Sequence, residues 1–227
     1  MEPIVREEEV EARVGRLRLP GHLTMPEEAL GIVVFSHGSG SSRHSPRNRF
    51  VAAVLNEAGL GTFLFDLLTS EEELDRGKVF DIELLSGRLV GATRWLGSQP
   101  GTDGLPVSYF GASTGAAAAL WAAAEVDLGI TAVVSRGGRP DLAGQCLCLV
   151  SAPTLLIVGS LDQVVLDLNR GAQAHLRCEN CLAVVPGAGH LFEEPGTLQA
   201  AAELALDWFA SHLWTAGRSS GHERELG

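Results

Sequence analysis

Short apolar runs rich in β-branched residues alternate with longer segments of helical periodicity along this chain, and this alternation limits the fold more than any other feature. It predicts a mostly parallel sheet with helices on both faces, an α/β fold. Right-handed crossovers place the helices on the two faces of the sheet. Because the strands are parallel, their carboxyl ends share one edge, where sites form in open α/β sheets. The parallel strands are expected at 31–36, 61–65, 105–110, 130–135, 154–159 and 182–185, and the helices at 45–58, 81–96, 113–126 and 196–213.

The size of the chain fits one domain. Its 227 residues, 45% of them hydrophobic and 20% charged, are enough for a single core of ordinary globular composition. Residues 10–19 alternate in polarity and end at Pro20-Gly21, which predicts antiparallel strands before the parallel ones. We expect a single α/β domain over 1–214 and, because 215–227 is rich in Gly, Ser and charge, a flexible C-terminal tail.

The charge balance bears on partners. With 28 acidic and 17 basic residues the net charge is −11, which disfavours binding to nucleic acid. The first residues lack the pattern of a secretory signal, and no apolar run approaches the roughly 20 residues needed to span a bilayer. We therefore expect a cytoplasmic protein without nucleic-acid or membrane partners. The oligomeric state is left open.

Four cysteines occur as two close pairs: Cys146 with Cys148, and Cys178 with Cys181. The C-x-x-C spacing of the second pair allows a four-thiolate zinc site. However, the first pair lies in an apolar run and neither pair has a glycine-rich knuckle, so reduced thiols that act as small apolar residues are favoured. We expect no metal and no cofactor.

The segment Gly111-Ala-Ser113-Thr-Gly115 joins an expected strand to an alanine-rich helix. In this context a G-x-S-x-G pattern predicts a sharp turn that exposes the hydroxyl of Ser113, with the positive end of the helix facing it. The alternative is a tight turn of small residues without chemical function.

Two more polar residues follow expected strands. Asp162 comes just after 154–159, and His190 ends the loop after 182–185. Taken singly, Asp162 could cap a helix that begins near Val164, and His190 could be an ordinary surface histidine. Together they bring a carboxylate and an imidazole to the edge that holds Ser113, in the order Ser, Asp, His of one known hydrolase fold.

The chain resembles the α/β-hydrolases, and within them the dienelactone-hydrolase-like branch, over roughly residues 10–213. The motifs that carry the resemblance are S-H-G-S-G-S-S (36–42), G-A-S-T-G (111–115), G-S-L-D (159–162) and P-G-A-G-H (186–190). One departure is that dienelactone hydrolases use a cysteine nucleophile where this chain has Ser113, so dienelactone is a poor substrate expectation.

The resemblance implies a triad in which His190 deprotonates Ser113 and Asp162 orients the imidazole. The backbone amides of Thr114 and Ser39 are the expected oxyanion donors. By the same resemblance, His37 packs beneath the oxyanion loop and does not act as a second base.

A basic cluster follows the expected oxyanion loop and the strand at 130–135. One hypothesis is that Arg136 and Arg43 hold an anionic group of the substrate, since the arginine fork suits carboxylate or phosphate. The alternative is that these arginines pair with local carboxylates such as Asp66 and Asp141.

Only about eighteen residues separate Ser135 from Thr154, where larger relatives insert a lid domain. We expect no lid and a shallow site for a small or water-soluble substrate. The leading interpretation is hydrolysis of a small carboxylic ester through an acyl-serine intermediate. Thioester or other acyl hydrolysis is the nearest alternative, and a non-catalytic small-molecule-binding protein on the same fold is an alternative of another class.

Overall fold

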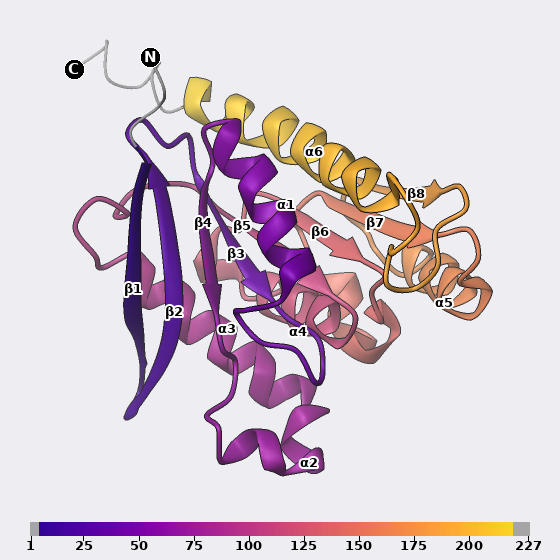
Figure 1. The fold of residues 1–227 in the computed structure, drawn as a ribbon, viewed down its shortest axis with the longest axis horizontal. Helices are drawn as coiled ribbons and strands as arrows, with labels where there is room; N and C mark the ends of the chain where they lie inside the picture. Colours follow the sequence, from indigo (N-terminus) through magenta and orange to yellow (C-terminus); the bar gives the residue numbers. More distant parts are fainter. Residues whose placement is uncertain (1–4, 220–227) are drawn as a thin grey trace.

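A computed structural model describes residues 5–219 and is built around an eight-stranded sheet (Figure 1). The spatial order of the strands is β1-β2-β4-β3-β5-β6-β7-β8. β1 and β2 are antiparallel to each other and β2 is antiparallel to β4, whereas all later pairs are parallel. The strands are β1 Val5–Val14, β2 Leu17–Pro26, β3 Ile32–Ser36, β4 Gly61–Phe65, β5 Val107–Ala112, β6 Val133–Arg136, β7 Thr154–Gly159 and β8 Asn180–Val185.

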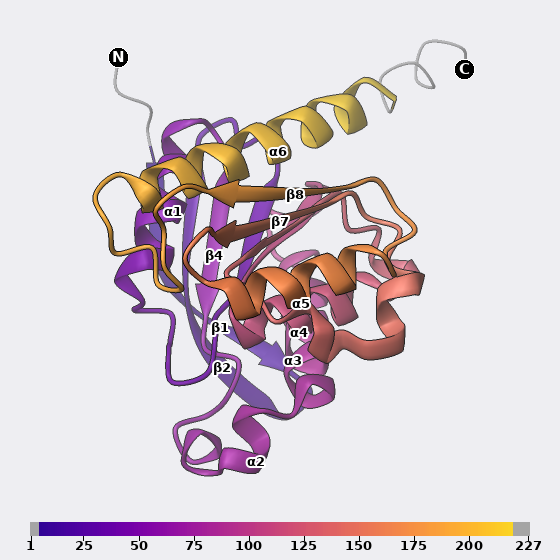
Figure 2. The same ribbon diagram turned by 90° about the vertical axis from the view of Figure 1, so that its right-hand side faces the viewer.

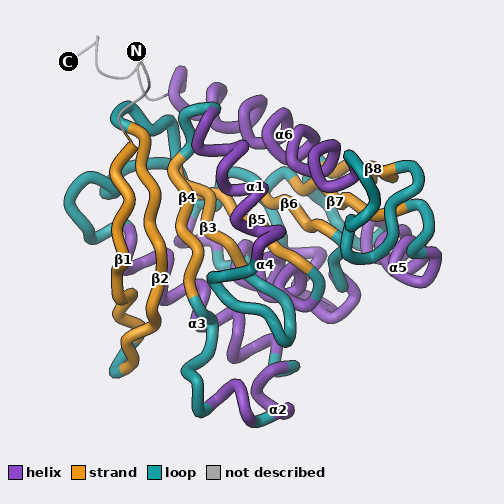
Figure 3. The backbone as a smooth tube through the Cα atoms, in the orientation of Figure 1, coloured by secondary structure: helices purple, strands orange, loops and turns teal. Residues whose placement is uncertain are grey.

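Helices cover both faces of this sheet, as the alternating pattern predicts (Figures 1 and 3). α1 and α6 pack on one face, and α3 and α4 pack on the other. Seen from the β8 edge, α6 lies above the sheet and α5 below it (Figure 2). The α-helices are α1 Pro46–Glu57, α2 Arg76–Val79, α3 Ile82–Leu96, α4 Thr114–Ala123, α5 Gln163–Gln173 and α6 Thr197–Ser219, with 3-10 turns at Glu72–Leu74, Val126–Leu128 and Pro140–Leu149.

The N-terminal hairpin differs from the prediction. The chain reverses at Gly15, whose φ is +61°, and not at Pro20-Gly21, which lies inside β2. Gly21 is needed there because a Cβ atom at this position would lie 2.4 Å from the Phe63 ring of β4. Gly21 is therefore required by close packing between strands. The Pro-Gly pair only resembles the sequence of a turn.

The C-terminal helix is longer than predicted. α6 continues through Ser219, five residues into the segment 215–227 that was expected to be a flexible tail. Gly217 costs a helix only about 1 kcal/mol relative to alanine, which is too little to end one already several turns long. The rest of that predicted tail, 220–227, lies outside the described residues. Within 5–219, no helix is long and apolar enough to cross a membrane.

The segment after β6 holds no lid. Its 3-10 turns, Pro140–Leu149, pack against α4 and α5, and its residues Ala143 and Leu147 are buried in the core. The carboxyl ends of β3, β5 and β7 consequently lie at an edge to which this segment adds no separate domain.

Candidate active site

The turn between β5 and α4 is strained at Ser113. Its φ of 52° is positive, which among residues other than glycine in the described chain occurs again only at Phe192. The flanking glycines make this turn possible, because a Cβ atom at Gly111 would lie 2.4 Å from Ala116 Cα and one at Gly115 would lie 2.1 Å from the Ser36 carbonyl oxygen. The turn holds Ser113 half-buried at the N-terminus of α4.

Asp162 and His190 are brought together by the loops after β7 and β8. His190 Nδ1 lies 2.7 Å from Asp162 Oδ2 and donates a hydrogen bond to it. Asp162 does occupy the N-cap position of α5, but its side chain makes no capping bond there. The carboxylate is 15% exposed and the imidazole 41% exposed, so the pair lies at the surface with the ring open to an incoming molecule.

Ser113 and His190 line one cavity of about 230 Å³. In the part of the chain that is described, no hydrogen bond joins Ser113 Oγ to His190. Such bonds are commonly long in hydrolases without substrate and tighten on binding. The cavity is thus the place where a bound carbonyl group would meet both side chains.

Glu194 and Phe192 hold the loop of His190 in place, and neither residue belongs to a sequence motif. The Glu194 carboxylate accepts a hydrogen bond of 3.0 Å from the backbone N–H of Gly189, and this bond lowers the pKa of Glu194. Phe192 is buried with a φ of 56°, a conformation that bulky residues rarely adopt. The backbone is therefore fixed before His190 by the hydrogen bond to Gly189 and after it by the packing of Phe192.

The predicted oxyanion donors meet each other directly. The backbone N–H of Ser39 donates a hydrogen bond of 2.8 Å to Oγ1 of Thr114. Thr114 begins α4, where backbone N–H groups have no acceptor within the helix. Gly38 lets the loop come this close, because a Cβ atom there would lie 2.9 Å from Ser113 Cβ.

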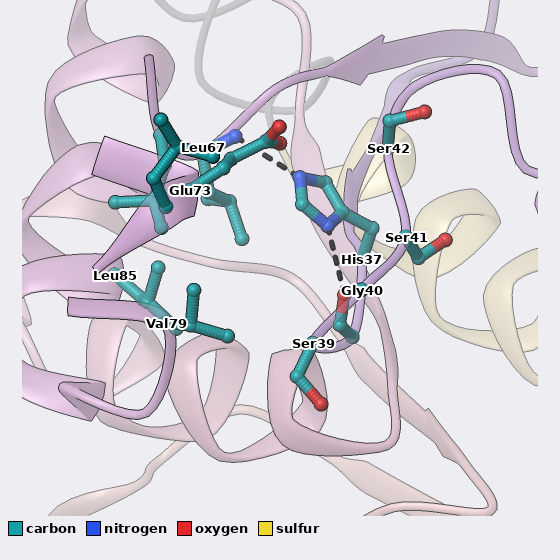
Figure 4. A pocket seen from close by; sticks show the side chains of 12 residues that line it. His37, Ser39, Gly40, Ser41, Ser42, Leu67, Glu73, Val79 and Leu85 are labelled. Carbon is teal, nitrogen blue, oxygen red and sulfur yellow. Dashed lines mark hydrogen bonds between the residues drawn. The ribbon is translucent and has the colours of Figure 1, made fainter. Parts of the chain in front are cut away.

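His37 links the oxyanion loop to the segment after β4. Its Nε2 accepts a hydrogen bond of 3.1 Å from the Leu67 N–H, and its Nδ1 lies 3.0 Å from the Gly38 carbonyl oxygen, to which it donates (Figure 4). Burial lowers the pKa of His37, so the ring is neutral at pH 7. With both ring nitrogens engaged, His37 fits the predicted packing role.

A second, larger cavity of about 420 Å³ shares lining residues with the first. Figure 4 shows the side chains that line this second cavity. Gly38, Ser39 and Ser41 line both cavities, so the oxyanion loop lies between them. The second cavity does not include Ser113, and leucine and valine side chains make up much of its wall: Leu67, Leu68, Leu74, Val79 and Leu85. It offers an apolar surface next to the cavity of the serine.

Arg43, named in the sequence hypothesis as a substrate-binding arginine beside Arg136, pairs with a local carboxylate in the structure. Its guanidinium pairs with Asp66, whose other oxygen accepts a hydrogen bond of 2.7 Å from the Arg43 backbone N–H. Arg139 pairs in the same way with Asp141, at 2.8 Å. Local carboxylates therefore neutralise both arginines, as the alternative interpretation of the basic cluster predicts. Neither arginine lines the cavity of Ser113.

Arg136 is different. It ends β6, is only 6% exposed and lines the cavity of Ser113. Burial, and then the charge of Arg47, lower the pKa of Arg136 to about 10, so it stays protonated at neutral pH.

The cysteines form no site with other metal-binding residues in the described chain. All four are free thiols, and no group of three or more His, Cys, Asp or Glu residues within 5–219 could hold a metal ion.

These features define an α/β-hydrolase fold, and known structures agree. A dienelactone hydrolase from Anabaena variabilis is 55% identical, with a TM-score of 0.89 over 93% of this chain and 99% of that one. A dienelactone-hydrolase-like promiscuous phosphotriesterase from metagenomic libraries shares the fold at 18% identity, with a TM-score of 0.75 over 92% and 98% of the two chains. The chain belongs to the dienelactone-hydrolase-like branch of the α/β-hydrolases. No model of a known protein family matches it.

Curated relatives carry a different name. Proteins from two strains of Mycobacterium tuberculosis, CDC 1551 / Oshkosh and H37Rv, are 62% identical over 218 residues and are provisionally named phosphoribosyl transferases. The match covers 96% of this chain but 49% of each relative, so the chain spans about half the length of the curated relatives it matches.

Proposed function

We propose that this chain is a serine hydrolase that cleaves a small carboxylic ester through an acyl-serine intermediate. The observation that carries the proposal is the 2.7 Å hydrogen bond between His190 Nδ1 and Asp162 Oδ2, beside a cavity that Ser113 also lines. Because Nδ1 carries the proton and donates a hydrogen bond to the carboxylate, Nε2 of the neutral imidazole is unprotonated and can accept a proton.

In the proposed reaction, Ser113 Oγ attacks the ester carbonyl while His190 Nε2 takes its proton. Asp162 stabilises the imidazolium without becoming protonated. The oxyanion is stabilised by the backbone N–H groups of Thr114 and Ser39, and each such donor is typically worth about 2.7–4 kcal/mol in the transition state. His190 then protonates the leaving alcohol, and water releases the acid by the reverse sequence of proton transfers.

The fold and the membership in the branch support hydrolysis, whereas the choice of ester rests on the site. A thioester has the same carbonyl chemistry, so a thioesterase with this triad is the nearest alternative. A non-catalytic binding protein is disfavoured because it would need neither the strained turn at Ser113 nor the Asp162–His190 pair.

We further infer that the activity in the name of the Mycobacterium tuberculosis relatives resides in the half that this chain does not cover. The covered half corresponds to an α/β-hydrolase fold, which accounts for nearly all of the residues of this chain.

A fluorophosphonate probe, which phosphonylates an activated serine, tests the proposal. We expect one added mass on the native protein, at Ser113, and none on Ser113→Ala. Ser98→Ala, which changes an exposed serine after α3, should label like the native protein. Absence of labelling on the native protein would contradict the hydrolase proposal. A panel of short-chain aryl esters and acyl thioesters then separates the two hydrolase alternatives.

A further inference from the structure

Arg136 is a buried cation without an anion. In the described chain its guanidinium makes no ion pair, its Nε has no hydrogen-bond partner, and the amide oxygen of Asn48 is 3.5 Å from one terminal nitrogen. The ring of Phe192 lies below it, 5.5 Å from the guanidinium carbon. Neither a neutral amide nor an aromatic face neutralises a charge that is more than nine-tenths buried, and leaving it unpaired is costly.

The surroundings of Arg136 add positive potential. Arg47 lines the same cavity, and its nearest carboxylate, that of Glu193, is 3.5 Å away at the exposed rim. Ser45, which caps the twelve-residue helix α1, and Asn48 in its first turn also line the cavity, and the N-terminus of this helix carries partial positive charge. Two guanidinium groups and a helix N-terminus thus face one small space, in a protein whose net charge is −11.

The anion that fits this space must lie close to the serine. The backbone carbonyl of Arg136 accepts a hydrogen bond of 3.3 Å from the Ser113 N–H, and both side chains line the cavity of about 230 Å³. A molecule whose carbonyl group reaches Ser113 would therefore place a group a few bonds away beside Arg136.

We infer that the cavity of Ser113 contains an anion subsite, made by Arg136, Arg47 and the N-terminus of α1, that selects esters bearing a carboxylate or a phosphate near the ester bond. This inference rests on the proposed function and names the substrate class of the same site. The planar guanidinium recognises either group through paired N–H donors. The apolar cavity beyond the oxyanion loop remains available for the rest of the substrate.

The first test uses two esters that differ in one group, mono-(4-nitrophenyl) glutarate and 4-nitrophenyl pentanoate. We expect the native protein to show a higher kcat/KM for the anionic ester. Arg136→Met should lower kcat/KM for the anionic ester by about tenfold or more, the usual effect of losing a hydrogen bond to a charged group, and leave the neutral ester within about twofold. Arg49→Gln, on an exposed position of α1 outside the cavity, is the matched control.

The second test needs no change at the buried position and identifies the anion. Inorganic phosphate and acetate are titrated as inhibitors of pentanoate-ester hydrolysis at ionic strength held constant with chloride. Inhibition by either ion beyond that of chloride, weakened in Arg47→Gln, supports the subsite, and the stronger ion indicates its preferred group. Native protein that is labelled at Ser113 but shows neither ester preference nor specific inhibition would overturn the subsite alone. Native protein that is not labelled would overturn the proposed function.

Discussion

The backbone N–H of Ser39 donates a 2.8 Å hydrogen bond to Oγ1 of Thr114, although the two residues are 75 positions apart. The bond ties the loop after β3 to the start of α4. It also occupies a donor that the proposed reaction needs for the oxyanion. A neutral hydrogen bond contributes about 1 kcal/mol, less than the roughly 2.7–4 kcal/mol of an oxyanion donor, so exchange of one for the other in the transition state is favourable.

Removing this competing acceptor should therefore help catalysis. In Thr114→Val we expect kcat/KM for a short ester to rise, by at most about fivefold, which corresponds to the 1 kcal/mol no longer lost. Thr114→Ser keeps the hydroxyl and should match the native protein. Steady-state kinetics on both variants checks this. A fall in Thr114→Val would mean instead that the bond acts mainly by holding the loop.

Replacing the Asp162 carboxylate with an amide should nearly abolish turnover without unfolding the protein. In Asp162→Asn the imidazole of His190 loses the acceptor that fixes its tautomer, and we expect kcat to fall by about 10⁴, as in other triads. Asp167→Asn, an exposed change on α5, is the control. Equal activity of the two variants, measured at unchanged melting temperature, would contradict the assigned role.

The neutral His37 makes stability depend on pH. Burial holds the pKa of folded His37 below the ordinary histidine value of about 6.5, so the unfolded chain takes up the proton first as the pH falls. Stability from this group is complete above pH 6.5 and is lost below it, by at most about 1.36 kcal/mol per pH unit. Protonation would also break the bond from the Leu67 N–H to Nε2.

Urea unfolding at pH 8, 6.5 and 5 measures this loss. Glutamine retains an acceptor but does not titrate, so His37→Gln should be less stable than the native protein at pH 8 and lose less stability between pH 6.5 and 5. Parallel pH curves for the two proteins would argue against a titrating His37.

Two glycine-to-alanine changes should have opposite effects. A Cβ atom at Gly115 would lie 2.1 Å from the Ser36 carbonyl oxygen, so Gly115→Ala should lower the free energy of unfolding by about 3 kcal/mol or more. Gly87, on the exposed side of α3, has open space around it, and Gly87→Ala should raise stability by up to about 1 kcal/mol. Chemical denaturation of both variants checks the pair, and a tolerated Gly115→Ala would show that α4 can shift away from β3.

Features with local causes were predictable from the sequence. The strand at 154–159 has the predicted bounds, and α1 and α3 begin next to the side-chain caps Ser45 and Asp81. The turn at Ser113 follows from two glycines at fixed spacing between a strand and a helix. These features depend on neighbours a few residues away, whose effect on the backbone is the same in most folds.

Features decided by distant contacts were not predictable. Pro20-Gly21 resembles a turn, but Gly21 is required by the Phe63 ring of a neighbouring strand. Phe192 and Glu194, which fix the loop of His190, belong to no motif, since their roles arise from packing and from one backbone N–H.

The sequence by itself determined the kind of sheet, the turn at Ser113 and the order in which serine, aspartate and histidine reach its edge. Only the tertiary structure decided the charges: Arg43 is neutralised by Asp66, whereas Arg136 is buried without a carboxylate. The physical reason is that a local pattern fixes the backbone position from which a side chain extends. Which charge it meets depends on strand register and on loops that converge from distant parts of the chain.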